Sequence, residues 1–170
     1  DIQITIERLC QQLIEHHGNF KNTVIVGVQP RGTLLSNRII VKLKQLLNTT
    51  NLDSGSLDIS FYRDDLRRRD EPIVPEIMDM NLSLEGKNVV LIDDVLFTGR
   101  SIRSAIDALM AFGRPKSVEL LTLIDRRFSR DLPIQPNYVG RTIDVIDSER
   151  VIVEWKEVNG KDRIVMVKSD

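Results

Sequence analysis

Two adjacent carboxylates, followed by a short loop with hydroxyls and a glycine, form the segment of this sequence that most clearly predicts chemistry. Asp93 and Asp94 follow the apolar run Val89–Ile92, and Thr98–Ser101 opens the next predicted helix. The first turn of a helix offers unpaired N–H groups and a partial positive charge, which bind phosphate. Acids beside a phosphate would repel it, so we expect them to accept hydrogen bonds from sugar hydroxyls. The segment predicts a site for a phosphorylated sugar, whereas the plainer alternative is that the acids cap a turn.

Other nucleotide-binding motifs do not fit this segment. No glycine precedes Gly99 at the spacing of a Walker loop, Arg100 stands where that loop has lysine, and no GxGxxG pattern occurs in the chain. Nucleoside triphosphate and dinucleotide sites are therefore disfavoured.

Composition limits the classes of protein that the chain can belong to. Its 170 residues include 24 Lys and Arg against 25 Asp and Glu, and the net charge of −1 provides no general attraction for nucleic acid or anionic membranes. Cys10 is the single cysteine, so an intrachain disulfide and a cysteine-rich zinc site are excluded. No apolar run approaches the ~20 residues of a membrane span, and the polar start does not resemble a signal peptide. We expect a soluble cytoplasmic protein without a membrane partner, and Asp1 in place of Met predicts that residues precede this sequence.

The elements that must position these residues alternate between strand and helix. Apolar spacing predicts helices around 6–14, 35–47 and 102–109, strands at 23–28, 57–61, 88–92, 118–124 and 138–140, and an antiparallel hairpin formed by 151–155 and 164–167 around Asn159-Gly160. Residues 48–55 are predicted to form a polar loop, and 62–84 a long charged loop. The alternation predicts one α/β domain over residues 1–170, with an open, mostly parallel twisted sheet flanked by helices.

In such sheets ligands bind beyond the carboxyl ends of the strands, so the loops that follow the strands are the candidate binding loops. Gln29-Pro30-Arg31-Gly32 follows the strand predicted at 23–28 and precedes the next helix. A structureless loop as long as 62–84 is usually a functional lid or disordered.

The segment Val89–Ser101 closely resembles the phosphoribosyl pyrophosphate (PRPP) signature of type I phosphoribosyltransferases. Further segments are similar to the PyrR family, pyrimidine operon regulators that also act as uracil phosphoribosyltransferases: Phe61–Leu66, Asp107–Leu109, Gly113–Pro115, Leu132–Ile134, Tyr138–Gly140 and Ser148–Val151. The resemblance implies the type I phosphoribosyltransferase fold, with a small hood at about 125–170 that includes the hairpin.

The resemblance also implies roles for particular residues. Asp93, Asp94 and Arg31 would be the catalytic residues, with the two acids at the ribose hydroxyls. The PRPP-binding segment would continue through Val95, Leu96, Phe97, Thr98, Gly99, Arg100 and Ser101, with the 5′-phosphate at its last four residues. The pyrophosphate loop would be Gln29, Pro30, Arg31 and Gly32. Related enzymes often have a cis peptide here, and proline lowers its cost from ~3–4 to ~0.5–1 kcal/mol, so we predict that the bond between Gln29 and Pro30 is cis.

Two further regions are matched less completely. Arg63 and Asp64 fall in the family's lid, at about 62–84, where the Arg67–Arg69 run is either solvated or clamps pyrophosphate. Asp125 and Arg126 would lie beside the base and the hood. The family commonly continues with Gly-His, whereas this chain has Arg127–Ser129 and is one residue longer. An alternative for Arg126 and its neighbour is a cluster of surface ion pairs.

The implied reaction forms UMP and diphosphate from uracil and PRPP. It would use Mg²⁺ held mainly by PRPP oxygens, with no confident metal ligand among the protein side chains. We assign no general base, and His16 and His17 are expected to be cations at a helix C-terminus. One alternative is a purine phosphoribosyltransferase acting on hypoxanthine or guanine. The family also implies a homodimer or a dimer of dimers.

The resemblance also implies that the enzyme regulates pyrimidine operon transcription by binding leader mRNA under the control of UMP or UTP. Another alternative is a regulator of this kind with little enzyme activity. RNA binding requires a basic face. The candidate cations, which could lie on one face of a dimer, are Arg114, Arg126, Arg127, Arg130 and Arg141. Against this, the outward face of the first helix carries Glu7, Gln11, Gln12 and Glu15.

Overall fold

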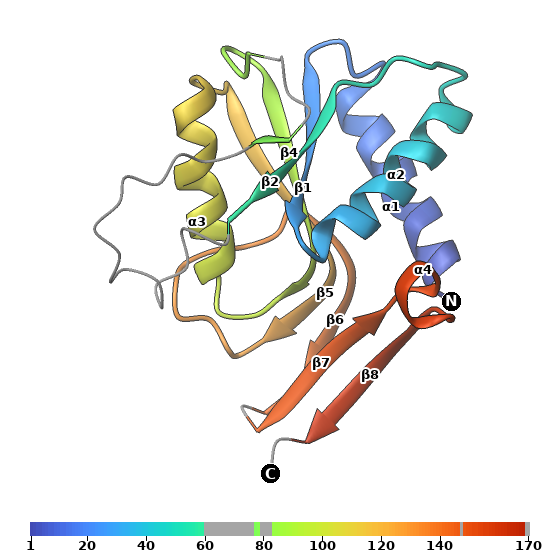
Figure 1. Cartoon of the computed structure of the whole chain (residues 1–170), viewed down its shortest axis with the longest axis vertical. Helices are drawn as coiled ribbons and strands as arrows, with labels where there is room; N and C mark the ends of the chain where they lie inside the picture. The colour runs from blue at the N-terminus through green and yellow to red at the C-terminus, as the bar shows by residue number, and fades with distance from the viewer. Residues whose placement is uncertain (60–76, 79–82, 147, 169–170) are drawn as a thin grey trace.

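A six-stranded sheet forms the centre of the molecule in the computed structural model, which describes residues 1–59, 77–78, 83–146 and 148–168 (Figure 1). The strand order is β3-β2-β1-β4-β5-β6. All neighbouring pairs are parallel except β2 and β3. The strands are β1 (Thr23–Gln29), β2 (Ser54–Asp58), β3 (Ile77–Met78), β4 (Asn88–Leu96), β5 (Ser117–Arg127) and β6 (Tyr138–Asp144). The predicted mostly parallel α/β fold is confirmed.

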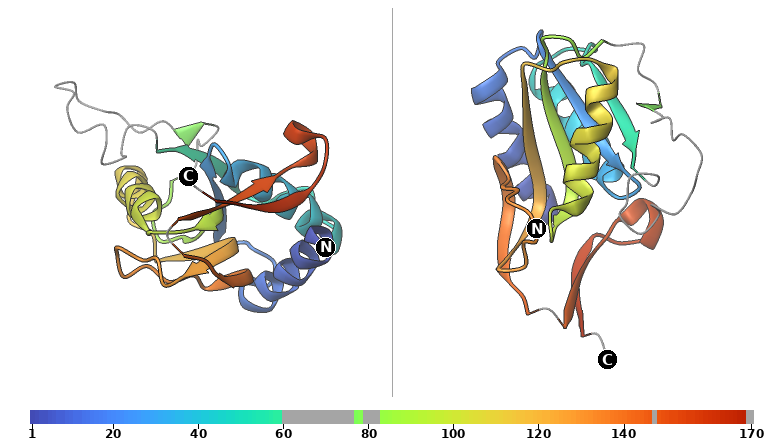
Figure 2. Two further views of the ribbon diagram at one scale, coloured as in Figure 1. Left: turned by 90° about the horizontal axis from the view of Figure 1, so that it is seen from below. Right: turned by 90° about the vertical axis from the view of Figure 1, so that its left-hand side faces the viewer.

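Helices cover both faces of this sheet (Figure 2). α1 (Ile2–His17) and α2 (Gly32–Leu46) lie on one face, and α3 (Arg100–Leu109), continued by the short 3₁₀ helix η2 (Met110–Phe112), lies on the other. Successive residues of a strand point to opposite faces, so Ile25 packs with α1 and α2, whereas Val24 and Val26 pack with α3. None of the described helices has the length and apolar character needed to cross a membrane.

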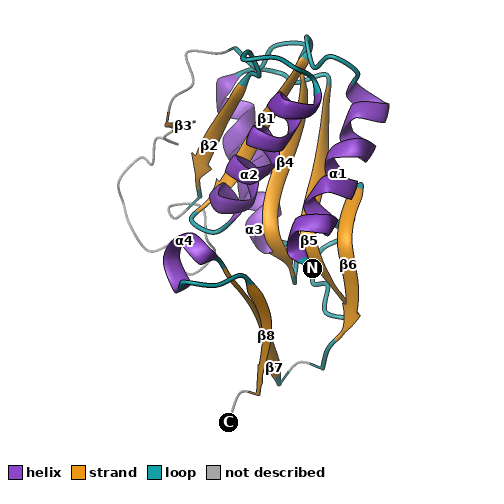
Figure 3. Cartoon of the chain, turned by 90° about the vertical axis from the view of Figure 1, so that its right-hand side faces the viewer, coloured by secondary structure: helices purple, strands orange, loops and turns teal. Residues whose placement is uncertain are grey.

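A separate two-stranded sheet stands beyond the carboxyl ends of the parallel strands (Figures 1 and 3). It consists of β7 (Glu149–Glu154) and β8 (Arg163–Lys168), which are antiparallel, and confirms the predicted hairpin. The connection differs from a simple Asn-Gly turn, because the one-turn helix α4 (Lys156–Asn159) joins the strands and Gly160 ends it in the left-handed conformation. Buried Val151, Val153 and Trp155 attach this hairpin to the core on the α1 and α2 face.

Several predicted boundaries are wrong, and strand pairing explains most of the differences. β2 begins at Ser54, inside the predicted polar loop, because residues 54–58 pair with 25–29 of β1. β2 also ends at Asp58, before the predicted end. β5 and β6 pair as far as Arg127 and Asp144, and both strands are therefore longer than expected. The predicted structureless loop at 62–84 contains β3.

The order of the strands places a crevice between β1 and β4. After β1 the chain crosses by way of α2 to β2 on one side, whereas β4 continues by way of α3 to β5 on the other. Ligands in open α/β sheets bind where the strand order reverses in this way. The fold therefore brings the loop after β1 and the acids of β4 to one place.

Candidate active site

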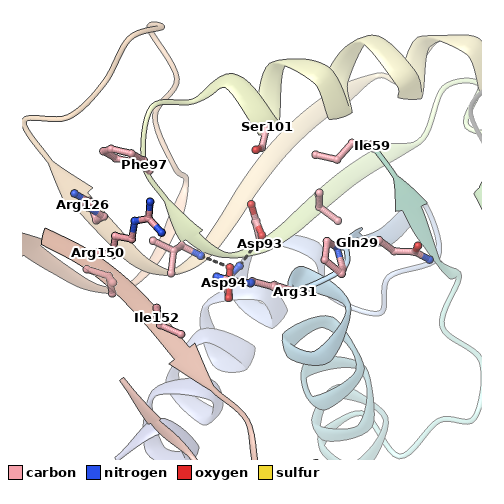
Figure 4. A pocket seen from close by; sticks show the side chains of 14 residues that line it. Gln29, Arg31, Ile59, Asp93, Asp94, Phe97, Ser101, Arg126, Arg150 and Ile152 are labelled. Carbon is pink, nitrogen blue, oxygen red and sulfur yellow. Dashed lines mark hydrogen bonds between the residues drawn. The ribbon is translucent and has the colours of Figure 1, made fainter. Parts of the chain in front are cut away.

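A cleft of about 820 Å³ opens at the carboxyl ends of β1 and β4, with the hairpin as part of its wall (Figure 4). Its lining combines residues from five parts of the chain: Val28, Gln29, Pro30, Arg31, Ile59, Asp93, Asp94, Val95, Phe97, Ser101, Arg126, Arg150, Val151 and Ile152. Eight of the predicted PRPP and pyrophosphate residues line this cleft, and Arg126 from the predicted base side joins them.

The adjacent acids lie within β4 rather than after its end, which corrects the predicted boundary. β4 continues to Leu96 because Asp93, Val95 and Leu96 pair with residues of β5. Neighbouring strand residues point to opposite faces, and in Figure 4 the carboxylate of Asp93 is directed toward Ser101, whereas that of Asp94 is directed toward Arg31. One acid therefore faces each of the two strand-to-helix junctions.

Asp94 is the more buried of the two acids, with 3% of its surface exposed. Its Oδ1 accepts the backbone N–H of Val95 at 2.8 Å, while its buried Oδ2 has no hydrogen-bond partner. Burial raises the pKa of Asp94, and the Val95 N–H and the charge of Arg31 oppose this change. The buried oxygen leaves Asp94 able to accept a hydrogen bond from a ligand hydroxyl.

The junction between β1 and α2 carries the predicted pyrophosphate loop. The peptide bond between Gln29 and Pro30 is cis, which confirms the prediction. Gly32 lies so close to β4 that an added Cβ would be 2.3 Å from the carbonyl oxygen of Ile92. Only glycine allows the loop to lie against the neighbouring strand, with the exposed side chain of Arg31 at the cleft.

The junction between β4 and α3 carries the predicted phosphate turn. Gly99 has a φ of 91°, and α3 begins at the next residue. The carbonyl oxygen of Thr98 accepts the N–H groups of Asp131 and Leu132, which fixes the turn from outside. Of the four predicted phosphate residues, Ser101 lines the cleft. Leu96, predicted to bind PRPP, has its side chain in the core on the α3 face, and that side chain is not a candidate contact.

The opposite side of the cleft from the pyrophosphate loop is formed by Phe97, Arg126 and the hairpin (Figure 4). The guanidinium carbon of Arg126 lies 3.8 Å from the centre of the Phe97 ring, and Arg126 is only 4% exposed. Arg126 is therefore not part of a surface ion-pair cluster. That alternative holds for Arg127, whose side chain is half exposed and pairs with Asp144 at 2.8 Å.

Asp125, the other residue predicted for the base side, is not among the residues that line the cleft. It lies in β5 and forms an ion pair with Arg130 at 2.5 Å. Arg130 also donates to the carbonyl oxygens of Phe97 and Ile134. Asp125 thus fixes the loop after β5 through Arg130, next to the cleft rather than in it.

Within one copy of the chain, the five arginines predicted for a basic face of a dimer are not gathered on one surface. Arg126 is buried, and the guanidinium of Arg130 is hydrogen-bonded to Asp125 and to backbone carbonyls. Arg114 precedes β5 and Arg127 ends it, so at about 3.3 Å per residue the strand separates them by roughly 30 Å. Exposed Arg114 and Arg141 therefore lie in different regions of the surface.

The two histidines form a network far from the cleft, at the start of β5 and β6. Nε2 of His17 lies 2.8 Å from Glu119, and the hydroxyl of Tyr138 donates to the same carboxylate at 2.7 Å. Nδ1 of His16 lies 2.8 Å from the Tyr138 hydroxyl. These contacts tie the end of α1 to the sheet, a more specific role than the predicted terminal cations.

The predicted lid residues Arg63 and Asp64 lie outside the described residues. Sequence reasoning missed Arg150, Val151 and Ile152, although it predicted their strand and noted that this segment resembles the PyrR family. The signal that could have found them is the alternation of β7, in which Val151 and Val153 are buried, whereas Arg150 is exposed and Ile152 is half-buried.

Comparison with known proteins gives consistent matches. The phosphoribosyl transferase domain family matches residues 1–157. The bifunctional protein PyrR of Ligilactobacillus salivarius is 44% identical over 168 residues, covering 96% of this chain and 92% of that protein. The bifunctional protein PyrR of Enterococcus faecalis OG1RF is 41% identical over 165 residues, covering 97% and 91%.

Solved structures show the same fold. The hypoxanthine phosphoribosyltransferase of Trypanosoma cruzi has a TM-score of 0.72 at 17% identity and covers 99% of this chain and 93% of its own. A hypoxanthine phosphoribosyltransferase from Staphylococcus aureus has a TM-score of 0.63 at 29% identity and covers 85% and 74%. The hairpin at the carboxyl end of the sheet is thus part of a known architecture.

Proposed function

This chain belongs to the phosphoribosyltransferase family and, within it, to the PyrR proteins, and on that basis we propose that it is a uracil phosphoribosyltransferase. The reaction transfers the 5-phosphoribosyl group of PRPP to a ring nitrogen of uracil, forming UMP and diphosphate. One observation carries the proposal: a single cleft joins two acids, the start of a helix and a cationic loop. These three features match the hydroxyls, the 5′-phosphate and the pyrophosphate of one PRPP molecule.

Asp93 and Asp94 would hold the ribose. Their carboxylates point to opposite faces of β4, so they can accept hydrogen bonds from two neighbouring hydroxyls without competing for one. The turn 98–101 would hold the 5′-phosphate through backbone N–H groups and the Ser101 hydroxyl, assisted by the positive end of α3.

Arg31 and the backbone of the loop from Gln29 to Gly32 would hold the pyrophosphate. The guanidinium side chain of Arg31 is exposed at the cleft and attracts Asp94 electrostatically. A guanidinium binds phosphate oxygens through charge-assisted, often bidentate hydrogen bonds. Arg31 would therefore stabilise the charge that develops on the leaving group.

The base would lie against Phe97, Arg126 and the hairpin. Phe97 provides an apolar ring, and a pyrimidine can stack on such a surface. Arg126 provides N–H donors, which suit the carbonyl oxygens of uracil. This arrangement places the base on the far side of the ribose from Arg31.

The chemistry needs positioning more than covalent help from the protein. The bond between C1 of the ribose and pyrophosphate breaks, its electron pair leaves with diphosphate, and the new bond forms to the uracil nitrogen, whose proton passes to solvent. The acids and the phosphate turn would fix C1 between leaving group and base, and such orientation can provide several kcal/mol. Arg31 would supply the electrostatic stabilisation. We assign no general base.

The acids at the cleft are compatible with Mg²⁺ bound together with PRPP. In the described part of the chain, no three His, Cys, Asp or Glu side chains are grouped closely enough to hold a metal. Mg²⁺ is usually bound by one or two carboxylates together with substrate phosphates and water, and Asp93 and Asp94 are the carboxylates at hand. When bound, Mg²⁺ would neutralise charge on the leaving pyrophosphate.

A base-selection assay tests the enzyme proposal. The protein is incubated with PRPP, Mg²⁺ and radiolabelled uracil, hypoxanthine or orotate, and nucleotide formation is measured. We expect UMP to form with a kcat/KM at least ten times that of the other bases. Preference for hypoxanthine would instead identify a purine enzyme, and the absence of transfer to any base would overturn the proposal.

The likeness to proteins called bifunctional favours a second function, regulation of pyrimidine genes by RNA binding. In this proposal UMP or UTP occupies the cleft and controls binding to leader mRNA, and two or four copies of the chain assemble to build the RNA surface. The surface of one copy contributes little, because Arg126 and Arg130 are used internally and α1 exposes Glu7, Gln11 and Glu15.

Salt dependence tests the regulatory proposal. Binding of a pyrimidine leader RNA is measured at 50 and 200 mM salt, with and without UMP, alongside sedimentation of the protein. Several phosphate contacts predict a loss of about 10³-fold or more in affinity across this range. Weak binding that neither salt nor UMP changes would show that this chain is an enzyme without the regulatory function.

A further inference from the structure

A single arginine of α2 holds the far end of the hairpin. Nε and Nη2 of Arg38 donate to the two carboxylate oxygens of Glu157 at 2.9 and 2.6 Å. Its Nη1 and Nη2 donate to the two oxygens of Asp162, both at 2.7 Å. Glu157 belongs to α4, and Asp162 lies just before β8. Both acids that Arg38 contacts thus lie in the connection between β7 and β8.

The same guanidinium covers the tryptophan that anchors the hairpin. The guanidinium carbon of Arg38 lies 4.8 Å from the ring centre of Trp155, which is 2% exposed and belongs to the core on that face. Arg38 itself is largely covered, with 17% of its side-chain surface exposed. The pKa values of Glu157 and Asp162 are lowered, chiefly by hydrogen bonds to Arg38, so both acids are charged in this arrangement.

The hairpin needs such an anchor because its strands pair only with each other among the described residues. A two-stranded sheet is marginally stable by itself in water. Its orientation on the body depends on the buried side chains Val151, Val153 and Trp155 and on the contacts of Arg38. The outer strand β8 is mostly exposed and adds no further support.

The orientation of the hairpin matters because β7 forms a wall of the cleft. Arg150, Val151 and Ile152 line the cleft on the side of Phe97 and Arg126 (Figure 4). α2, which carries Arg38, begins at Gly32, directly after the pyrophosphate loop. At 1.5 Å per residue, Arg38 lies about 9 Å along the helix from this start. One helix therefore connects the loop at one side of the cleft with the wall at the other (Figure 3).

We propose that Arg38 is a positioning residue, which fixes the hairpin on α2 and thereby holds Arg150–Ile152 at the base side of the cleft. Arg38 does not line the cleft and acts through β7. Its effect falls on the base rather than on PRPP, since the acids, the phosphate turn and Arg31 belong to elements that do not depend on the hairpin. The catalytic consequence rests on the proposed function, whereas the anchoring can be measured without it.

The test compares Arg38→Met with Lys42→Met in the full chain. Lys42 lies on the same helix and pairs with Glu7 of α1 at 3.4 Å, so its replacement removes a similar ion pair that does not touch the hairpin. Arg38→Met should raise the KM for uracil about five- to tenfold, with kcat and the KM for PRPP within twofold of wild type. Lys42→Met should leave all three constants unchanged. An equal rise in both KM values, or no rise, would overturn the proposal.

Two further measurements report the anchor itself. Trp155 is the only tryptophan of the chain, so acrylamide quenching of its fluorescence should increase at least twofold in Arg38→Met but not in Lys42→Met. Amide hydrogen exchange of residues 150–153 should be at least tenfold faster in Arg38→Met. If wild type does not use uracil, the proposed function fails, but these two readouts still decide whether Arg38 holds the wall. Unchanged exchange would refute the anchor even in an active enzyme.

Variants of the partner residues separate anchoring from a general loss of stability. Glu157→Gln combined with Asp162→Asn removes both carboxylates from the hairpin side and should reproduce the uracil KM of Arg38→Met. Combining all three substitutions should add less than twofold, because the same contact is removed. Arg38→Lys should restore only part of the effect, since lysine lacks the planar fork that spans both acids. Additive effects would show that the residues act independently and would contradict the proposal.

Discussion

The two strand-to-helix junctions of the cleft have the same architecture but different chemistry. Both follow buried parallel strands and both open a helix, α2 after β1 and α3 after β4. The first junction presents the cation Arg31, whereas the second follows the acids Asp93 and Asp94. In the proposed function, two copies of one local structure hold the two ends of one substrate, because the charges beside each helix start differ.

Glycine is required at both junctions, for different physical reasons. At Gly32 the limit is space, because an added Cβ would lie 2.3 Å from a backbone oxygen of β4. At Gly99 the main limit is conformation, with a φ of 91°, and an added Cβ would also lie 2.9 and 3.1 Å from Cγ1 and Cβ of Ile134. The first junction is therefore locked against the sheet, whereas the second is held by its left-handed turn and by the 131–134 loop that packs on it.

The two acids lie between the junctions, with one carboxylate directed toward each. Among the substitutions that test the difference between the junctions, Asp94→Asn should have the largest effect on activity. The amide keeps the size of the side chain but loses the charge and one acceptor oxygen at the proposed ribose position. We expect kcat/KM for PRPP to fall by about 10²–10³, the range seen when one preorganised polar contact is removed from a transition state.

Steady-state kinetics with a matched variant check this expectation. Asp107→Asn changes an exposed acid of α3 that pairs with Arg103 at 4.0 Å, and it should leave kcat/KM within twofold of wild type. Turnover of Asp94→Asn equal to that of the control would show that the acid pair only shapes the turn.

The next largest effect is on stability and separates the two glycines. Gly32→Ala should lower the free energy of unfolding by about 2–3 kcal/mol, because the methyl group collides with fixed backbone. Gly99→Ala should cost about 1–2 kcal/mol for the left-handed conformation. Gly86→Ala is the control, since Gly86 also has a positive φ but nothing lies within 4 Å of an added Cβ. Urea unfolding measures all three, and a Gly32→Ala as mild as the control would show that this junction is not locked.

A smaller effect tests the cation of the first junction. Arg31→Gln should raise the KM for pyrophosphate in the reverse reaction about tenfold, because a charge-assisted hydrogen bond is lost. The KM for uracil in the forward reaction should change less than twofold. Arg103→Gln, an exposed arginine of α3, serves as the control. A change of the uracil KM in Arg31→Gln that matches the change for pyrophosphate would indicate a general disturbance of the cleft.

Sequence patterns predicted the junctions because their information is local. The apolar β-branched run of β1, the run before Asp93, and the glycines at both helix starts each restrict the structure within a few residues. Eight residues of the two predicted junctions line one cleft. The resemblance to a family then supplied the substrate, which no local pattern contains.

The features that were missed depend on long-range contacts. Ser54–Ser56 have little strand propensity and form β2 because β1 pairs with them. Arg126 was predicted beside the base, but its contact with the ring of Phe97, 3.8 Å from the guanidinium carbon, was not. The hairpin itself was predictable, but its place at the cleft depends on contacts such as that of Arg38 with Glu157, 119 residues away in sequence.

The smallest expected effect measures the electrostatic link between the junctions through stability. Burial raises the pKa of Asp94 above its ordinary value of 3.8, so the folded protein binds this proton more tightly than the unfolded chain does. The stability that this group contributes is therefore complete below pH 3.8 and is lost as pH rises through the raised pKa. Asp94→Asn removes this dependence and should be more stable than wild type at pH 7, by about 1 kcal/mol, with the difference vanishing near pH 3.

Because Arg31 opposes the rise in the pKa of Asp94, the stability gained by Asp94→Asn should be larger in an Arg31→Gln background. Urea unfolding of the four proteins from pH 3 to 8 measures this coupling. A stability loss in Asp94→Asn at every pH would mean that the hydrogen bond to Val95 outweighs the cost of the buried charge.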